Sequence, residues 1–278
     1  MKTGIIDVGG GLRGIYAAGV LDYCIKKQIS FDYCIGISAG SANITSYLAQ
    51  QYKRNYKFYH EYSFRKEYMG LYPLIHTGSF IDMNYVYGTL SNSTGEFPLD
   101  YRKLKESSAE LFVAVTEAET GQPKYFTKDD IAPDDYRILM ASSSIPGINQ
   151  PYTIHGVPYY DGAVGDPIPI QKAFQDGCER LVLVLTKPVD TIRSPKKDRR
   201  LAHLIRRKYP LTAKQLCLRA QHYNTAVASA KEYARQGKIL ILAPDDITGV
   251  DTLSKNKSAL DRLYHKGFED GKQILSWL

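Results

Sequence analysis

Five short, largely apolar segments, separated by stretches long enough to form helices, constrain the fold of this 278-residue chain most strongly. Short apolar runs bounded by turn residues are typical of buried strands, and strands that alternate with helices form parallel sheets. The predicted strands are residues 3–8, 31–37, 111–116, 180–185 and 238–243. The predicted helices are residues 16–27, 41–59, 211–235 and 259–278, with Gly70 and Gly237 as stops. The sequence therefore predicts an α/β fold with a mostly parallel sheet.

The length and the N-terminus limit the classes of protein to consider. A chain of this size fits one large α/β domain or two small ones, and 44% hydrophobic residues suffice for a buried core. The chain passes directly from Met1 into a strand without a charged-then-apolar leader. The longest apolar runs, 181–185 and 239–243, are too short to cross a bilayer. We therefore expect a cytoplasmic protein whose membrane contact, if any, is peripheral.

Cysteine spacing and net charge limit the cofactors and partners that this chain is expected to bind. The four cysteines show no Cys-x-x-Cys pair and no ligand-like spacing with the six histidines, so we expect reduced thiols and no metal. They are Cys24, Cys34, Cys178 and Cys217. A net charge of +7 suits an anionic partner, either nucleic acid or an acidic lipid surface, and does not choose between them.

A serine framed by two glycines stands at the second predicted turn. The motif Gly36-Ile37-Ser38-Ala39-Gly40 ends an apolar run and precedes a segment whose apolar residues have helical spacing. In acyl hydrolases a tight strand-to-helix turn of this kind projects a serine Oγ into a cleft, and Gly36 and Gly40 leave room for it. The pattern Gly-x-Ser-x-Gly also occurs by chance in loops. The strand predicted before it and the helix predicted after it favour a nucleophile at Ser38.

A glycine-rich segment, Gly9-Gly10-Gly11-Leu12-Arg13-Gly14, follows the first predicted strand and leads into a helix. Successive glycines let backbone N–H groups converge on an anion. Two anions suit this segment: a dinucleotide pyrophosphate, with Asp32 at the ribose-binding distance, and the oxyanion of an acyl intermediate. A dinucleotide domain has no need of the Ser38 motif, and both turns emerge at the carboxyl ends of parallel strands, so acyl transfer is favoured.

A serine nucleophile needs a base, and the sequence offers histidines or an aspartate. His203, His222 and His265 lie late in the chain, where an α/β-hydrolase places its histidine, but none has a supporting context. Asp161 ends a short predicted strand and is followed by Gly162. An Asp-Gly turn at the end of a strand presents the aspartate carboxylate at a defined place. The structural alternative for Asp161 is an ordinary hairpin turn.

Together, the glycine-rich segment, the Ser38 motif and Asp161-Gly162-Ala163 resemble the three signatures of the patatin-like phospholipase family, in the family's order. Residues 141–147, followed by Pro151, also resemble the family's segment before the aspartate. The resemblance covers about residues 4–190 and extends more weakly into 191–278, which is similar to bacterial members. It implies a three-layer α/β/α fold, and we expect a single domain over 1–278 that the C-terminal part completes.

The resemblance also implies a Ser-Asp dyad without histidine, with Ser38 as nucleophile and Asp161 as its base. It implies an oxyanion hole in the glycine-rich segment, formed by Gly9, Gly10, Gly11, Arg13 and Gly14. Ala163 stands where many members have glycine, which is a common variation. Arg13 has two open roles, a positive charge near the oxyanion or a salt bridge on the first helical turn.

Aromatic and basic residues crowd the segment after the nucleophile helix. They are Tyr52, Tyr56, Phe58, Tyr59, Tyr62, Phe64, Tyr68 and Tyr72, interleaved with Lys53, Arg54, Lys57, Arg65 and Lys66. Such mixing binds single-stranded nucleic acid, walls an acyl-chain cleft or lies at a lipid interface. The structural alternative is a packed helical cap with a solvated basic face.

The region from Asp190 to Lys208 is dense in positive charge and has no sustained apolar stripe. We expect a solvated, mobile insertion there, and the alternative is a surface that docks on anionic membrane.

These observations favour a serine acyl hydrolase that acts on acyl lipids, phospholipids among them, without metal or organic cofactor and without a nucleic-acid partner. The alternative is a non-catalytic lipid- or nucleotide-binding α/β protein. Covalent labelling of Ser38 by a fluorophosphonate distinguishes the two.

Overall fold

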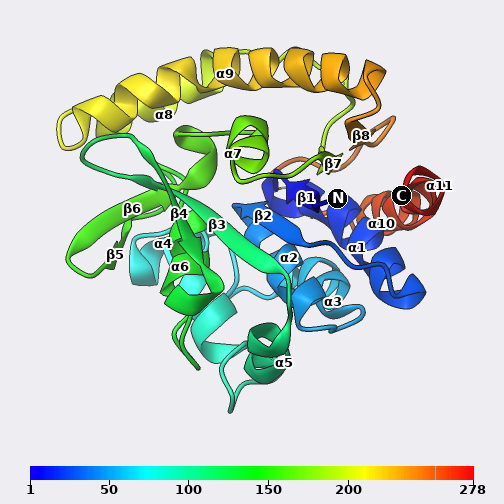
Figure 1. Cartoon of the computed structure of the whole chain (residues 1–278). Helices are drawn as coiled ribbons and strands as arrows, with labels where there is room; N and C mark the ends of the chain where they lie inside the picture. Colours follow the sequence, from blue (N-terminus) through cyan, green and yellow to red (C-terminus); the bar gives the residue numbers. More distant parts are fainter. Residues whose placement is uncertain (254) are drawn as a thin grey trace.

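The computed structural model describes residues 1–253 and 255–278 and contains one eight-stranded sheet between helices (Figure 1). The strands are β1 (Thr3–Asp7), β2 (Tyr33–Ile37), β3 (Glu110–Glu117), β4 (Pro123–Thr127), β5 (Tyr152–Ile154), β6 (Val157–Asp161), β7 (Arg180–Val184) and β8 (Ile239–Leu242). Their order is β5-β6-β3-β2-β1-β7-β8, and β4 pairs with β3. The five predicted strands are confirmed as β1, β2, β3, β7 and β8, with ends that shift by at most two residues.

Five of these strands form the parallel part of the sheet. β1 pairs in parallel with β2 and β7, β2 with β3, and β7 with β8. The pairs of β3 with β4 and β6, and of β5 with β6, are antiparallel. The fold is therefore mixed α/β with a mostly parallel central sheet, as predicted.

Helices cover both faces of the sheet. They are α1 (Ile15–Lys27), α2 (Ala39–Leu48), α3 (Arg54–His60), α4 (Leu71–Thr77), α5 (Tyr101–Glu106), α6 (Arg137–Ser142), α7 (Ile170–Gln175), α8 (Lys196–Ile205), α9 (Pro210–Arg235), α10 (Lys257–Asp270) and α11 (Lys272–Trp277). Successive strand residues point to opposite faces, so Ile5 packs into the core shared with α1, α2 and α10, whereas Ile6 packs into the core shared with α7 and α9. Figure 1 shows α8 and α9 along one side and α1, α2 and α10 on the other.

Two helices predicted as continuous are divided, which corrects the sequence-based boundaries. Residues 41–59 belong to α2 and α3, because Gln50 and Lys53 between them have positive φ, which ends one helix and redirects the chain before the next. Residues 259–278 belong to α10 and α11, which meet at Gly271. Gly70 precedes α4 rather than ending a helix, whereas Gly237, with φ 71°, follows α9 as predicted.

Residues 190–208, where we expect a solvated and mobile insertion, contain the helix α8. Asp198 on α8 is buried and pairs with Arg219 on α9, and Ala202 and Ile205 pack against the same neighbour. The sequence shows no long apolar stripe here because a buried ion pair and only two buried apolar residues hold α8 in place. Its remaining basic side chains, including Lys196, are exposed.

The C-terminal part is joined closely to the N-terminal part. β8 extends the sheet beside β7, and α10 packs on α1 at two glycines. A Cβ on Gly19 would lie 2.1 Å from the Tyr264 carbonyl oxygen, and one on Gly267 would lie 1.9 Å from that of Tyr16. The two helices therefore approach so closely that only glycine fits at these positions.

Candidate active site

Ser38 lies in the turn between β2 and α2 and is almost fully buried. Its φ of 56° is rare for a residue with a side chain, and its N–H donates to Ser142 Oγ at 2.9 Å. A Cβ on Gly36 would lie 2.4 Å from Ser41 Cα, and one on Gly40 would lie 2.3 Å from the Asp7 carbonyl oxygen. The two glycines thus allow the tight strand-to-helix turn that the sequence predicts.

The register of β3 brings Asp161 next to Ser38. β2 pairs with one edge of β3 and ends with Ile37 opposite Ala114. β6 pairs with β3 from the next position, where Asp161 lies opposite Val115. β4 occupies the opposite edge of this stretch of β3, so β2 and β6 meet end to end along a single edge. Ser38, which follows Ile37, therefore lies beside Asp161.

The Asp161 carboxyl is buried and hydrogen-bonded. Its Oδ1 accepts the Ala163 N–H at 2.8 Å, and a side-chain hydrogen bond joins it to Ser38. Burial raises the pKa of the Asp161 carboxyl above its ordinary value, while the hydrogen bonds from Ser38 and Ala163 oppose that rise. A Cβ on Gly162 would lie 2.3 Å from the Ala114 carbonyl oxygen, so glycine is required after the aspartate.

The glycine-rich segment forms a loop against the end of β2. Gly9, Gly10 and Gly11 have φ values of 64°, 130° and 61°, which L side chains rarely adopt. A Cβ on Gly9 would lie 2.2 Å from the Ile37 carbonyl oxygen, and one on Gly11 would lie 2.3 Å from that of Thr252. The loop therefore sits directly beside the Ser38 turn.

The amide groups of this loop differ in their partners. The Gly9 N–H donates to Asp7 Oδ1 at 2.9 Å, and the Leu12 N–H donates to the Thr252 carbonyl at 3.0 Å. Within residues 1–253 and 255–278, no acceptor hydrogen-bonds the N–H of Gly10 or Gly11. Of these two glycines, Gly11 lines a cavity that Ser38 also lines.

Arg13 and Gly14 complete the loop in different ways. The Arg13 Nη1 donates to Asp251 Oδ1 and Thr252 Oγ1, both at 2.8 Å, and its Nη2 lies 3.2 Å from the position of a Cβ on Gly10. Burial lowers the pKa of Arg13, and the charge of Asp251 opposes this effect. Arg13 thus forms an ion pair with Asp251, and its guanidinium also lies beside Gly10. Gly14 packs under the Tyr59 ring, where a Cβ would lie 2.6 Å from the hydroxyl.

Sequence reasoning missed Asp7 and Asn43, which link the loop to α2. Asp7 is fully buried, and its Oδ2 accepts the Asn43 Nδ2–H at 2.8 Å. Asn43 also donates to the Gly14 carbonyl at 2.9 Å and accepts from the Tyr59 hydroxyl at 3.1 Å. Burial raises the pKa of Asp7 to about 6. An aspartate at the end of an apolar strand, two residues before Gly9, was the available signal.

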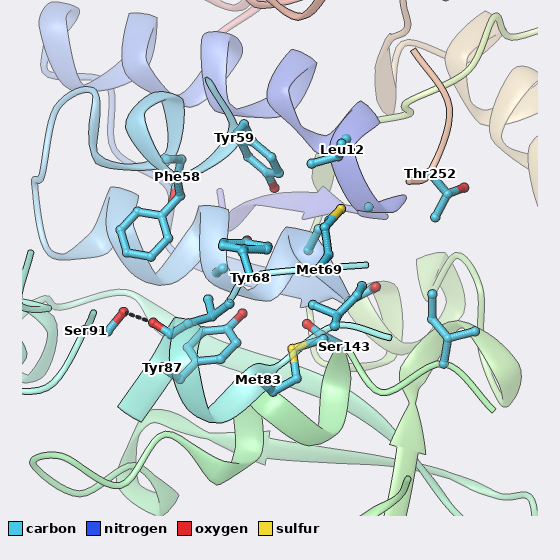
Figure 2. A pocket seen from close by; sticks show the side chains of 18 of the residues that line it. Leu12, Phe58, Tyr59, Tyr68, Met69, Met83, Tyr87, Ser91, Ser143 and Thr252 are labelled. Carbon is cyan, nitrogen blue, oxygen red and sulfur yellow. Dashed lines mark hydrogen bonds between the residues drawn. The ribbon is translucent and has the colours of Figure 1, made fainter. Parts of the chain in front are cut away.

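An apolar cavity of about 70 Å³ leads away from Ser38 and Gly11. Figure 2 shows Phe58, Tyr68 and Tyr87, from three separate segments, facing one another across it. Other lining residues are Leu12, Tyr59, Met69, Ile81, Met83 and Val86. Three residues of the predicted aromatic stretch, Phe58, Tyr59 and Tyr68, therefore line the same cavity as Ser38.

The remaining candidates lie elsewhere or form no site. His203, His222 and His265 are exposed and do not line this cavity. All four cysteines are free thiols. Across the described parts of the chain, no three metal-binding side chains come together, and no helix is long and apolar enough to span a membrane.

Most of this chain is similar to a known protein family. A family model described as patatin-like phospholipase matches residues 8–174, which hold the glycine loop, Ser38 and Asp161, and a domain of unknown function (DUF6363) matches residues 209–278. The uncharacterized protein YjjU of Escherichia coli K12 is 25% identical over 249 residues, which cover 86% of this chain and 67% of YjjU.

Among solved structures, VipD from Legionella pneumophila is similar with a TM-score of 0.48 and 13% identity, over 99% of this chain and 66% of VipD. The chain therefore spans about two thirds of the length of each relative. The phospholipase family supports a lipid-hydrolase function. Because its model matches more than half of the residues, the chain belongs to the patatin-like phospholipase family.

Proposed function

We propose that this protein is a serine hydrolase that cleaves ester bonds of acyl lipids, phospholipids among them, through an acyl-enzyme on Ser38. The observation that carries the proposal is the meeting of Ser38 and Asp161 at successive positions along β3, with Ser38 lining an apolar cavity. A nucleophile, a buried carboxylate and a lipid-compatible wall thus occupy one place.

The reaction has two halves. Asp161 accepts the Ser38 Oγ proton as Oγ bonds to the ester carbonyl carbon, and the proton then passes to the leaving alcohol as its C–O bond breaks. In the second half Asp161 accepts a proton from water as that water attacks the acyl carbon, and Ser38 recovers a proton as the acid leaves. The raised pKa of Asp161 makes it a stronger base than an ordinary aspartate.

The oxyanion of each tetrahedral intermediate is assigned to the Gly10 and Gly11 N–H groups, which have no acceptor among the described residues. Gly9 and Gly14 shape the loop through their contacts with Asp7 and Tyr59. Arg13 adds positive potential beside the loop while Asp251 holds its guanidinium.

The test is a comparison of Ser38→Ala, Asp161→Asn and the double variant on a soluble ester. We expect each single variant to lose turnover by at least about 10³-fold, and the double variant to be no worse, because the two residues act as one unit. Fluorophosphonate should label the parent on Ser38. Full activity in Asp161→Asn, or inactivity of a folded His203→Ala, His222→Ala or His265→Ala variant, would contradict the dyad. Absence of labelling would favour a non-catalytic binding protein.

A further inference from the structure

Arg54 is a buried cation that lines the same cavity as Ser38. It is the first residue of α3, is 5% exposed, and lines both this cavity and a smaller one beside it. The smaller cavity is also lined by Ser46, Ser91 and Tyr136. Arg54 thus brings a positive charge to a cavity whose lining is mostly apolar.

The partners of Arg54 are all uncharged. Nη1 donates to Ser46 Oγ at 3.2 Å, and Nη2 donates to Ser91 Oγ at 2.8 Å and to the Phe97 carbonyl at 3.2 Å. The buried Nε has no hydrogen-bond partner in the described chain. The guanidinium carbon lies 4.4 Å from the centroid of the Phe58 ring. Arg54 therefore retains an unused donor as well as a charge.

The other buried arginines, unlike Arg54, each form an ion pair with a carboxylate. Arg13 pairs with Asp251, and Arg219 pairs with Asp198. No carboxylate of residues 1–253 or 255–278 forms an ion pair with Arg54. Burial lowers the pKa of Arg54 to about 10, so the group remains charged at neutral pH. A buried cation without a counter-ion opposes folding unless an anion joins it.

The distance between Ser38 and Arg54 sets the length of a ligand that reaches both residues. Ser38 immediately precedes α2, and Ser46, which contacts Arg54, lies eight residues later on that helix, or about 12 Å along its axis. An extended chain advances about 1.2 Å per bond, so roughly ten bonds separate the two ends. Met69 and Met83, which Figure 2 shows on the cavity wall, are flexible side chains that adapt to such a chain.

We propose that Arg54 forms an anion subsite that selects acyl chains of about eight to ten carbons ending in a carboxylate, with the ester at Ser38 and the terminal carboxylate on the guanidinium. This specificity rests on the proposed hydrolase function for the position of the ester end. The subsite itself depends only on the cavity and on Arg54.

The decisive experiment measures binding without turnover. The Ser38→Ala protein is titrated calorimetrically with monomethyl decanedioate and with dimethyl decanedioate, which differ only in the terminal charge. We expect the monoacid to bind at least about tenfold more tightly, because it alone pairs with the buried cation. Arg54→Gln in the same protein should abolish the difference. Lys57→Gln, which removes a charge from the same helix but does not line the cavity, should preserve it.

A length series keeps the test valid if Arg54→Gln fails to fold. Monomethyl esters of dicarboxylic acids with six, eight, ten and twelve carbons should show a maximum preference near eight to ten, because Arg54 lies at a fixed distance from Ser38. Equal affinity for charged and uncharged ligands, a preference that ignores length, or a preference retained in a folded Arg54→Gln protein would overturn the subsite.

Hydrolysis measurements distinguish failure of the Arg54 subsite from failure of the proposed hydrolase function. If the parent cleaves 4-nitrophenyl decanoate and the mono-4-nitrophenyl ester of decanedioic acid with equal kcat/KM, the function stands and the subsite falls. If the binding preference is found but neither ester is cleaved, the subsite stands and the hydrolase proposal falls.

Discussion

At the residue scale, the site depends on a strained serine and on buried polar groups that hold it. Ser38 keeps a φ of 56°, a conformation that costs on the order of 1–3 kcal/mol in a residue with a side chain. Ser142 Oγ accepts the Ser38 N–H and donates to the Ala114 carbonyl at 2.7 Å, which ties the turn to β3. Asp7 holds the glycine loop in the same way. In the proposed reaction, these contacts orient the Ser38 turn and the glycine loop before a substrate arrives.

Asp7 gives a stability prediction with a defined sign. Its folded-state pKa of about 6 lies above the ordinary 3.8, so ionisation opposes folding. The stability that protonated Asp7 contributes is complete below pH ~4 and is lost as the pH rises through ~6. We expect the unfolding free energy of the parent, relative to Asp7→Asn, to fall between pH 4 and 7. Urea unfolding of both proteins across this pH range checks the prediction. Unfolding free energies that change equally with pH in the two proteins would contradict it.

At the element scale, α8 and α4 place apolar and basic side chains around the loop at residues 145–150. The position of a Cβ on Gly147 lies 3.1 Å from Leu204 of α8, and the Phe80 N–H, just after α4, donates to the Ile148 carbonyl at 3.1 Å. Ile145 of this loop lines the cavity. Leu204 is exposed, as is Ile75 of α4. We therefore propose that this surface contacts anionic membrane.

Charge reversal on α8 tests the membrane contact. Lys196, Arg199 and Arg200 are exposed, whereas Lys197 lies 3.5 Å from Asp251, the partner of Arg13, and is left unchanged. Each basic residue at an acidic surface contributes about 1 kcal/mol, and salt screens this attraction. Reversal of the three residues to Glu should weaken binding to anionic vesicles at low salt and leave soluble-ester turnover nearly unchanged.

The matched control reverses Lys26, Lys27 and Lys238, which are exposed at the amino ends of the strands, opposite Ser38. This variant should bind vesicles as the parent does. Equal vesicle binding by the α8 variant and the parent across a salt titration would eliminate the docking role of α8.

At the scale of the whole molecule, we propose that residues 1–278 form one cooperative domain, although two family models match separate parts. β8 extends the sheet, and Asp251 and Thr252 hold the glycine loop from the C-terminal part. Trp277 on α11 packs under Arg180 of β7, whose guanidinium carbon lies 3.8 Å from the ring centroid. The C-terminal part thus contacts both the sheet and the candidate site.

The single tryptophan makes this testable. Fluorescence of Trp277 reports on the C-terminal part, whereas far-UV circular dichroism reports on all helices. One domain predicts coincident urea transitions by the two probes. An earlier fluorescence transition, with most of the helical signal retained, would indicate a separate C-terminal unit.

The sequence by itself determined the five parallel strands, the glycine loop and the Ser38 turn, because apolar periodicity and glycine act through local geometry. It also placed Asp161 at the end of a strand, but only the pairing of β2 and β6 along β3 brings it beside Ser38. The division of the helix at Gln50, the burial of Asp198 and the uncompensated charge of Arg54 likewise depend on distant segments. Burial and charge pairing are properties of neighbours in space, which local patterns do not specify.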